Sequence, residues 1–197
     1  MSWQDTQRFV GKLSYKKLAN MSKLLLSYKL ATWQGRGSRW GLPMTLSVEP
    51  TTSCNLGCPE CPSGLKSFSR PTGTIDVDHV KQLVDEVKEH LIYLYFYFQG
   101  EPYVHPQFTE MVGLASRSGI YTVTSSNGHF LTPRRAQETL DSGLDRLIIS
   151  IDGSTQESYG RYRKGGELDK VLRGTETLIN AREKGGYNNP HVIWQTV

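Results

Sequence analysis

The sequence predicts an α/β fold in which short strands alternate with amphipathic helices around a parallel sheet. Two patterns carry this prediction. β-rich apolar runs recur after residue 43, and the segments between them repeat apolar residues at the three- and four-residue steps of a helix. Such alternation is typical of βα units, whose strands run parallel. With 197 residues, 37% hydrophobic and 21% charged, the chain is long enough to bury one sizeable core.

Residues 1–43 form a basic leader segment ahead of this alternation. They carry eight Lys and Arg side chains against one acidic residue, Asp5, so the rest of the chain is net negative within a total charge of +4. Apolar residues from Trp3 to Tyr28 recur at helical spacing, which predicts one amphipathic helix over roughly residues 3–33. The glycines and proline that predict a linker after this helix are Gly35, Gly37, Gly41 and Pro43.

Two interpretations of this leader helix stay open. Its apolar side packs on the body of the protein, or the helix lies on a membrane surface or a partner. We favour packing, because amphipathic stripes usually face a core. Since the basic charge is confined to one terminal segment, we expect no nucleic-acid partner. No apolar run approaches the ~20 residues that span a bilayer and no secretory signal opens the chain, so we expect a cytoplasmic protein.

Five strands and four helices are expected beyond the leader. The strands are 44–49, 91–98, 120–125, 146–151 and 191–197. The helices are 77–87, 106–115, 132–143 and a last one that begins at 168 and stops at Gly185 and Gly186. The chain ends inside an apolar strand with no helix after it, which leaves a sheet edge uncovered. We therefore expect either a fragment of a longer protein or a departure from the repeat at its end.

All three cysteines, Cys54, Cys58 and Cys61, lie in one loop directly after the first expected strand. Such loops, at the carboxyl ends of parallel strands, carry the reactive groups of α/β folds. Three closely spaced cysteines argue for metal ligation in a reducing compartment rather than for a disulfide framework. Soft thiolates select zinc or iron–sulfur, and three are one short of the four that close either site. A cluster with one open iron explains this shortfall, and a zinc site completed by His79, His90 or another distant ligand is the alternative.

The Cys-x3-Cys-x2-Cys spacing after the first strand resembles the signature of the radical S-adenosylmethionine (radical SAM) superfamily. The resemblance implies a partial (β/α)6 TIM-like barrel over residues 44–197, truncated at the C-terminus with about five strands present. It also implies a [4Fe–4S] cluster on Cys54, Cys58 and Cys61, whose fourth iron binds the amino and carboxylate groups of S-adenosyl-L-methionine. Glu60 departs from the family, in which an aromatic residue commonly precedes the last cysteine.

Polar residues at the ends of the later strands are suited to the same cofactor. The run 99–102 looks like the family's Gly-Gly-Glu-Pro motif, which hydrogen-bonds the methionyl ammonium, with Gln99 in place of the first glycine. The run 150–153 matches a Ser-x-Asp-Gly sequence that commonly ends the fourth strand in the family. Taken singly, such runs are also typical of ordinary turns. The predicted cofactor contacts are Gln99, Gly100, Glu101, Pro102, Ser126, Asn127, Ser150, Asp152 and Arg163.

These contacts differ in the chemistry they offer. Ser126 and Asn127 can donate hydrogen bonds to a carboxylate or a ribose. Ser150 and Asp152 share one face of a strand by its two-residue period. Arg163 offers two parallel donors to the cofactor carboxylate, although a solvated surface arginine is the plainer interpretation.

The resemblance implies an iron–sulfur enzyme that cleaves S-adenosylmethionine reductively, releasing a 5′-deoxyadenosyl radical that abstracts hydrogen from a substrate. The implied partners are an external electron donor of the flavodoxin or ferredoxin type and a peptide or protein substrate. The latter is typical of the branch whose longer members append a SPASM-type domain with auxiliary clusters. A non-catalytic iron–sulfur or zinc module for electron transfer or partner binding is the alternative from another class. A third alternative is a chain that binds these cofactors without turnover, since an incomplete barrel admits water.

Overall fold

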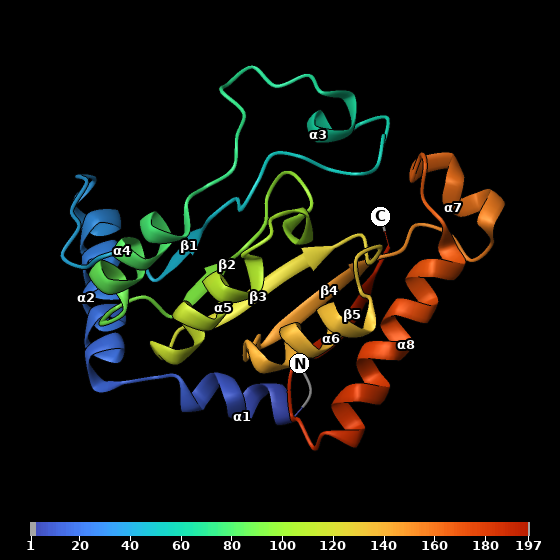
Figure 1. Cartoon of the computed structure of the whole chain (residues 1–197). Helices are drawn as coiled ribbons and strands as arrows, with labels where there is room; N and C mark the ends of the chain where they lie inside the picture. The colour runs from blue at the N-terminus through green and yellow to red at the C-terminus, as the bar shows by residue number, and fades with distance from the viewer. Residues whose placement is uncertain (1–2, 197) are drawn as a thin grey trace.

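The five strands pair in the order in which they occur in the sequence, and every pair is parallel. The computed structural model describes residues 3–196. The sheet is not closed into a barrel, and β1 and β5 form its two edges (Figure 1). The bounds of the strands are β1 Thr45–Ser47, β2 Tyr93–Tyr95, β3 Tyr121–Ser126, β4 Arg146–Ser150 and β5 His191–Gln195.

Four helices cover one face of this sheet, each lying between two consecutive strands in the chain (Figure 1). They are α4 Val77–Val87, α5 Phe108–Arg117, α6 Pro133–Asp141 and α8 Leu168–Lys184. The expected α/β fold with five strands and these four helices is confirmed, and a partial TIM-like barrel is consistent with it. Three short elements lie in loops between them: α3 Pro62–Leu65, the 3-10 helix η1 Pro102–Val104, and α7 Gln156–Tyr162.

The core lies between the sheet and these four helices. Leu94 and Phe96 of the second strand segment and Leu147 and Ile149 of β4 point toward the helices and are fully buried. By the two-residue period of a strand, their neighbours point to the opposite face. Tyr93 and Tyr95 therefore share that opposite face, with ring centroids 5.8 Å apart.

β1 and β2 are shorter than expected, although the ladder continues one bond past each. Val48 N donates to Tyr95 O and Phe96 N donates to Val123 O, both at 2.8 Å. Beyond these bonds the chain leaves the sheet for the loops at the carboxyl ends of the strands. The last residue of the fifth expected strand, Val197, lies outside the described residues.

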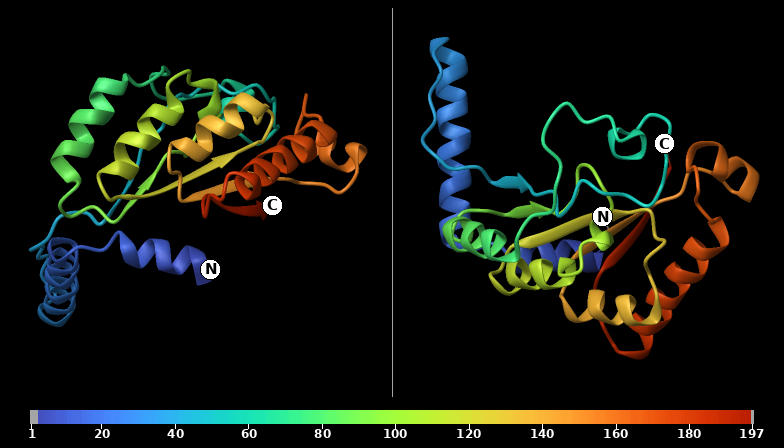
Figure 2. Two further views of the ribbon diagram at one scale, coloured as in Figure 1. Left: turned by 60° about the horizontal axis from the view of Figure 1, so that its bottom comes forward. Right: turned by 45° about the horizontal axis from the view of Figure 1, so that its top comes forward.

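Helix α1, Trp3–Gly11, covers the opposite face of the sheet from α4, α5, α6 and α8 (Figure 2). Phe9 stacks on Tyr93, with ring centroids 5.1 Å apart. Asp5 is buried, accepts a hydrogen bond from the Tyr121 hydroxyl and forms a salt bridge with Arg146. The tyrosine and the arginine are the first residues of β3 and β4, so α1 closes the amino-terminal end of the sheet.

A second buried carboxylate anchors α1 from the body side. Asp145 accepts hydrogen bonds from Arg8 Nε at 2.9 Å and NH2 at 2.6 Å, and from the Thr122 backbone amide at 2.9 Å. Lys12 Nζ lies 3.7 Å from the same carboxylate. Buried carboxylates need such partners, because an unpaired charge is costly away from water.

The single leader helix expected over roughly residues 3–33 is wrong. The structure has two helices, α1 and α2 Tyr15–Gln34, because α1 ends at Gly11 and Ser14 caps a new helix by accepting a hydrogen bond from Lys17 N. The favoured packing of the apolar stripe on the body is also wrong for α2. Its buried residues are Lys17, Asn20 and Ser27, whereas Leu25 and Tyr28 are 52% and 68% exposed.

Polar contacts explain this orientation of α2. Lys17 Nζ donates to Gly119 O at 2.6 Å, and Asn20 exchanges two hydrogen bonds with the Leu42 backbone. Within residues 3–196, no helix combines the length and the apolar character needed to cross a membrane. The division of the chain into a leader of residues 1–43 and a core of residues 44–197 stays a prediction.

We expect Asp145→Ala to lower the free energy of unfolding by about 3–5 kcal/mol, because Arg8 and the Thr122 amide lose their acceptor in a buried place. Urea denaturation measures this effect. Glu157→Ala is the control, since it removes an exposed salt bridge to Arg161 and should cost less than about 0.5 kcal/mol. Equal, small effects of both substitutions would contradict the buried network.

Candidate functional site

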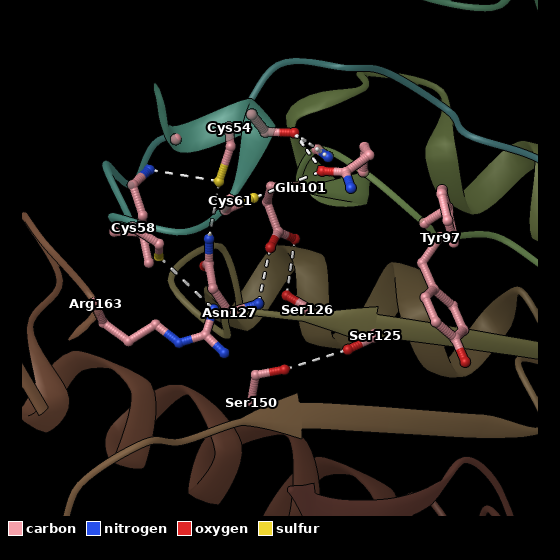
Figure 3. Close-up of a pocket in the computed structure, with 16 residues that line it drawn as sticks. Cys54, Cys58, Cys61, Tyr97, Glu101, Ser125, Ser126, Asn127, Ser150 and Arg163 are labelled. Atoms are coloured by element: carbon pink, nitrogen blue, oxygen red, sulfur yellow. Dashed lines mark hydrogen bonds between the residues drawn. The ribbon is translucent and has the colours of Figure 1, made fainter. Parts of the chain in front are cut away.

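The loop after β1 carries the three cysteines over the carboxyl ends of the strands (Figure 3). Backbone hydrogen bonds hold it in three places: Thr52 N donates to Gly73 O at 3.0 Å, Gly57 N to Lys164 O at 2.9 Å, and Glu101 N to Ser53 O at 2.8 Å. Its last cysteine immediately precedes α3, which begins with a proline, a residue suited to the first position of a helix.

One cavity brings together the cysteine loop and the ends of three strands. It is lined mainly by polar side chains and glycines, together with Leu56 and Phe98. Those singled out by the sequence are Cys54, Cys58, Cys61, Gln99, Gly100, Glu101, Ser126, Asn127, Ser150 and Arg163. Two further predicted contacts do not line it: Pro102 is buried at the start of η1, and Asp152 forms a 2.5 Å salt bridge with Arg163.

Gly100 allows the second strand to approach the cysteine loop. Its φ is +77°, and a Cβ atom at this position would lie 2.0 Å from Thr51 O. Its amide donates to Ser63 Oγ at 2.8 Å, and this hydroxyl donates to Gln99 Oε1 at 3.2 Å. Only glycine combines this backbone conformation with so close a contact.

The cysteine sulfurs are surrounded by polar groups. Cys54 Sγ accepts from Leu56 N at 3.5 Å and from Asn127 Nδ2 at 3.8 Å, and Cys58 Sγ accepts from Arg163 NH1 at 4.0 Å. Cys61 Sγ donates to a side-chain oxygen, Gln99 Oε1, at 3.6 Å. Burial raises the pKa of the Cys54 and Cys58 thiols. Metal binding at these thiols therefore releases protons, and its affinity depends on pH.

The three thiols are soft donors of the kind that an iron–sulfur cluster would need. Among residues 3–196, no group of three or more His, Cys, Asp or Glu side chains is placed to hold one metal ion. In a [4Fe–4S] cluster each thiolate binds a different iron, so the three sulfurs need not all point at one metal ion. N–H donors to sulfur are also among the groups that tune such clusters. His79 and His90, two of the residues considered as a fourth zinc ligand, do not line the cavity.

Glu101 is the one buried carboxylate in the cavity wall, with 2% of its surface exposed. It accepts hydrogen bonds from Ser126 Oγ and Asn127 N, each at 2.8 Å (Figure 3). It also accepts one from Tyr103 N at 3.3 Å. Burial raises its pKa to about 7, although these donors partly offset the effect. A cation beside it would favour the ionised form.

Two serines of the cavity wall, Ser63 and Ser125, were not among the predicted contacts, although Ser125 lies in the polar run 124–128 that the sequence places at the end of the third strand. The two-residue period of β3 places Ser125 on the same face as Tyr121, and its hydroxyl lies 3.3 Å from that of Ser150. The two-residue period of the strand was therefore the sequence signal that could have identified Ser125. No sequence signal marks Ser63, which reaches the cavity because α3 folds back toward Gly100.

A model of the radical SAM superfamily matches residues 48–192 of the chain. The chain belongs to this superfamily. It is similar to the AdoMet-dependent heme synthase of Methanosarcina barkeri, with 31% identity over 140 residues, 71% of this chain and 40% of the relative. It is also similar to mycofactocin maturase MftC of Mycobacterium tuberculosis, with 31% identity over 139 residues, 71% of this chain and 35% of the relative. The chain thus spans less than half of each relative.

The fold of this radical SAM chain is also found among solved structures. Native anSMEcpe with bound AdoMet superposes with a TM-score of 0.61 at 20% identity, over 78% of this chain and 43% of that one. At this identity the likeness concerns the fold alone. The superfamily predicted from the cysteine spacing is confirmed, whereas the roles of individual site residues stay predictions.

The stability of the metal-free chain should depend on pH through Glu101. Between the ordinary carboxyl pKa of 4.5 and its native value of about 7, the native carboxyl keeps a proton that the unfolded chain has released. The native state then binds more protons, so the free energy of unfolding falls as pH rises through this window, by about 3 kcal/mol. Urea denaturation at a series of pH values measures the fall.

Glu101→Gln cannot titrate and should lose this part of the pH dependence. Glu110→Gln, on the exposed side of α5, should keep it. An unchanged slope in Glu101→Gln would show that the buried carboxyl does not cause the fall.

Gly100→Ala should lose most of the iron that the wild-type chain takes up on anaerobic reconstitution, because its Cβ forces the second strand away from Thr51. Gly165→Ala is a matched control: its φ is +81°, and nothing lies within 4 Å of the added Cβ. Both variants carry the strain of a left-handed residue, about 1–2 kcal/mol. Equal iron content in the two would argue against a role for the close approach.

Proposed function

We propose that Cys54, Cys58 and Cys61 bind a [4Fe–4S] cluster, and that the protein uses it to cleave S-adenosylmethionine reductively and start hydrogen abstraction from a substrate. One observation carries the proposal: the three cysteines line the same cavity as the polar ends of β2, β3 and β4. A cluster held by three thiolates supplies electrons and one open iron for a chelating ligand.

The buried carboxylate is suited to bind the methionyl ammonium. Glu101 is the acidic side chain of the cavity wall, and Ser126 and Asn127 fix its two oxygens by hydrogen bonds. When an ammonium lies beside it, the carboxyl gives up its proton and the ion pair forms in a place sheltered from water. The residue thus binds and orients the cofactor rather than reacting with it.

Other groups of the cavity serve the remaining polar atoms of the cofactor. Arg163 would offer its guanidinium to the methionyl carboxylate, while its Nε donates a hydrogen bond to Asp152. The hydroxyls of Ser125 and Ser150 lie at the ends of adjacent strands, within reach of ribose oxygens. Tyr97 and Phe98 add aromatic surface to the wall.

We also propose an electron donor and a class of substrate for the protein. An external donor of the flavodoxin or ferredoxin type supplies the electron, as membership of the radical SAM superfamily implies. A peptide or protein is the substrate we propose, on the resemblance to the SPASM-type branch. The relatives are named for different products, heme and mycofactocin, so their names support the shared chemistry more than any one substrate.

The anaerobically reconstituted chain should be brown, hold about four irons, and release 5′-deoxyadenosine when given S-adenosylmethionine and dithionite. Cys58→Ser should lose iron and abolish the product, because it removes one of only three thiolates. Ser67→Ala, in the same loop but outside the cavity wall, should behave as wild type. Iron content and mass spectrometry of the product are the measurements.

Two outcomes would contradict the proposal. A colourless protein with stoichiometric zinc would indicate the zinc module instead. A brown protein that binds S-adenosylmethionine without releasing 5′-deoxyadenosine would indicate a chain that holds the cofactors but does not turn them over.

A further inference from the structure

Helix α2 presents a broad apolar surface to solvent. We define the exposed α2 face by Leu18, Leu25, Leu26, Tyr28 and Trp33, whose surfaces are between 41% and 83% exposed. Trp40, in the segment after the helix, is 54% exposed. Scattered apolar residues on a surface need no explanation, but a contiguous set on one helix marks an interaction site.

Helix α2 turns its polar side toward the body of the protein and its apolar side toward solvent, the reverse of the usual arrangement. Its polar residues Lys17, Asn20 and Ser27 are the buried ones, and hydrogen bonds from the first two to Gly119 O and to the Leu42 backbone hold that side against the body. The apolar residues therefore face outward in the folded chain. Rotation to bury them would break these bonds and leave an ammonium and an amide without partners.

The position of α2 leaves this face accessible to a large flat surface. The helix stands at the side of the molecule next to β1 and α4, and projects beyond the sheet (Figures 1 and 2). It has 20 residues, which at the rise of an α-helix makes it about 30 Å long.

The charge carried by α2 and the segment after it is of one sign, although Glu89, which follows α4, pairs with Lys16 near the start of α2. No Asp or Glu occurs between Asp5 and Glu49, whereas Lys23, Lys29, Arg36 and Arg39 lie on or just after α2. Among the described residues, none of these four forms a salt bridge. Pairing of this face with a second copy would bring the same positive charges together. Its complement is therefore an anionic surface with an apolar interior.

We propose that α2 binds the surface of a bilayer that contains anionic phospholipids. Leucines of the exposed α2 face enter the boundary between headgroups and acyl chains, Tyr28 and Trp33 lie at headgroup level, and the basic side chains contact lipid phosphates. The helix lies in the plane of the interface and does not cross the bilayer.

Flotation of the whole chain with lipid vesicles tests this proposal. The chain should float with vesicles of phosphatidylcholine mixed with phosphatidylglycerol and much less with phosphatidylcholine alone, and added salt should reduce the bound fraction. Tryptophan fluorescence should shift to shorter wavelength on addition of the mixed vesicles, and Trp33→Phe should reduce that shift.

Variants of α2 separate the apolar contribution to membrane binding from the electrostatic one. The double variant Leu25→Glu, Leu26→Glu should abolish flotation, whereas Leu172→Glu, at a 37% exposed position on α8, should not. The double variant Lys23→Gln, Lys29→Gln should weaken partitioning into mixed vesicles about 25-fold, at about fivefold for each lysine. Circular dichroism and release of 5′-deoxyadenosine without vesicles should match wild type in all of them.

Two results would overturn the proposal. One is a wild-type chain that does not float with either kind of vesicle. The other is sedimentation evidence of a dimer that Leu25→Glu, Leu26→Glu converts to monomer while flotation of the wild type is independent of anionic lipid, which would assign the exposed α2 face to a second copy.

Discussion

The candidate site depends on the close passage of two backbone segments, at Gly100 and Thr51. The cysteine loop belongs to the connection after β1 and the buried carboxylate to the connection after β2, and this contact lets the two connections come close enough to share one cavity. The hydrogen bond from Glu101 N to Ser53 O lies beside it. Two loops are thereby fixed to each other by main-chain atoms, which keeps the position of the cysteines independent of flexible side chains.

Burial shifts the pKa values of the ionisable groups that surround this contact. The thiols of Cys54 and Cys58 and the carboxyl of Glu101 all have pKa values raised by removal from water. Each therefore favours its neutral form until a positive charge lies beside it. A metal cluster at the sulfurs and an ammonium at the carboxylate would both supply this positive charge. Arg163, near Cys58 and paired with Asp152, adds a fixed positive charge at the border of the two regions.

Strong periodic signals were read correctly from the sequence, and tertiary effects were not. The apolar stripe of 77–87 and the alternation around Leu94 depend on local spacing, so the helix and the strand could be predicted. Helix α7 was missed because only Tyr159 of it is buried, and its start is marked by little more than the capping pair of Thr155 and Ser158. Ser63 was missed because its place in the cavity follows from how α3 folds back.

The prediction of a single leader helix packed on the body was wrong for a different reason. Its apolar stripe was interpreted on the assumption that apolar residues find a surface of the same chain. Whether such a surface exists depends on which side of the helix the body contacts, and Lys17 and Asn20 decide that by hydrogen bonds to distant backbone atoms. Spacing along the chain holds no information about those partners. The cysteine loop, by contrast, could be read because its ligands are neighbours in sequence.

The docking of α1 under the sheet has a consequence for the order of folding. Its partners Asp145 and Arg146 follow it by 137 and 141 residues, and both belong to the region where β4 begins. Contacts of such separation form slowly, because a long loop must close before they stabilise anything. During synthesis the N-terminal helix emerges from the ribosome long before the strands that hold it. This helix is therefore made before the strands but is among the last elements to reach its place, and until then it does not cover the tyrosine-rich face of the sheet.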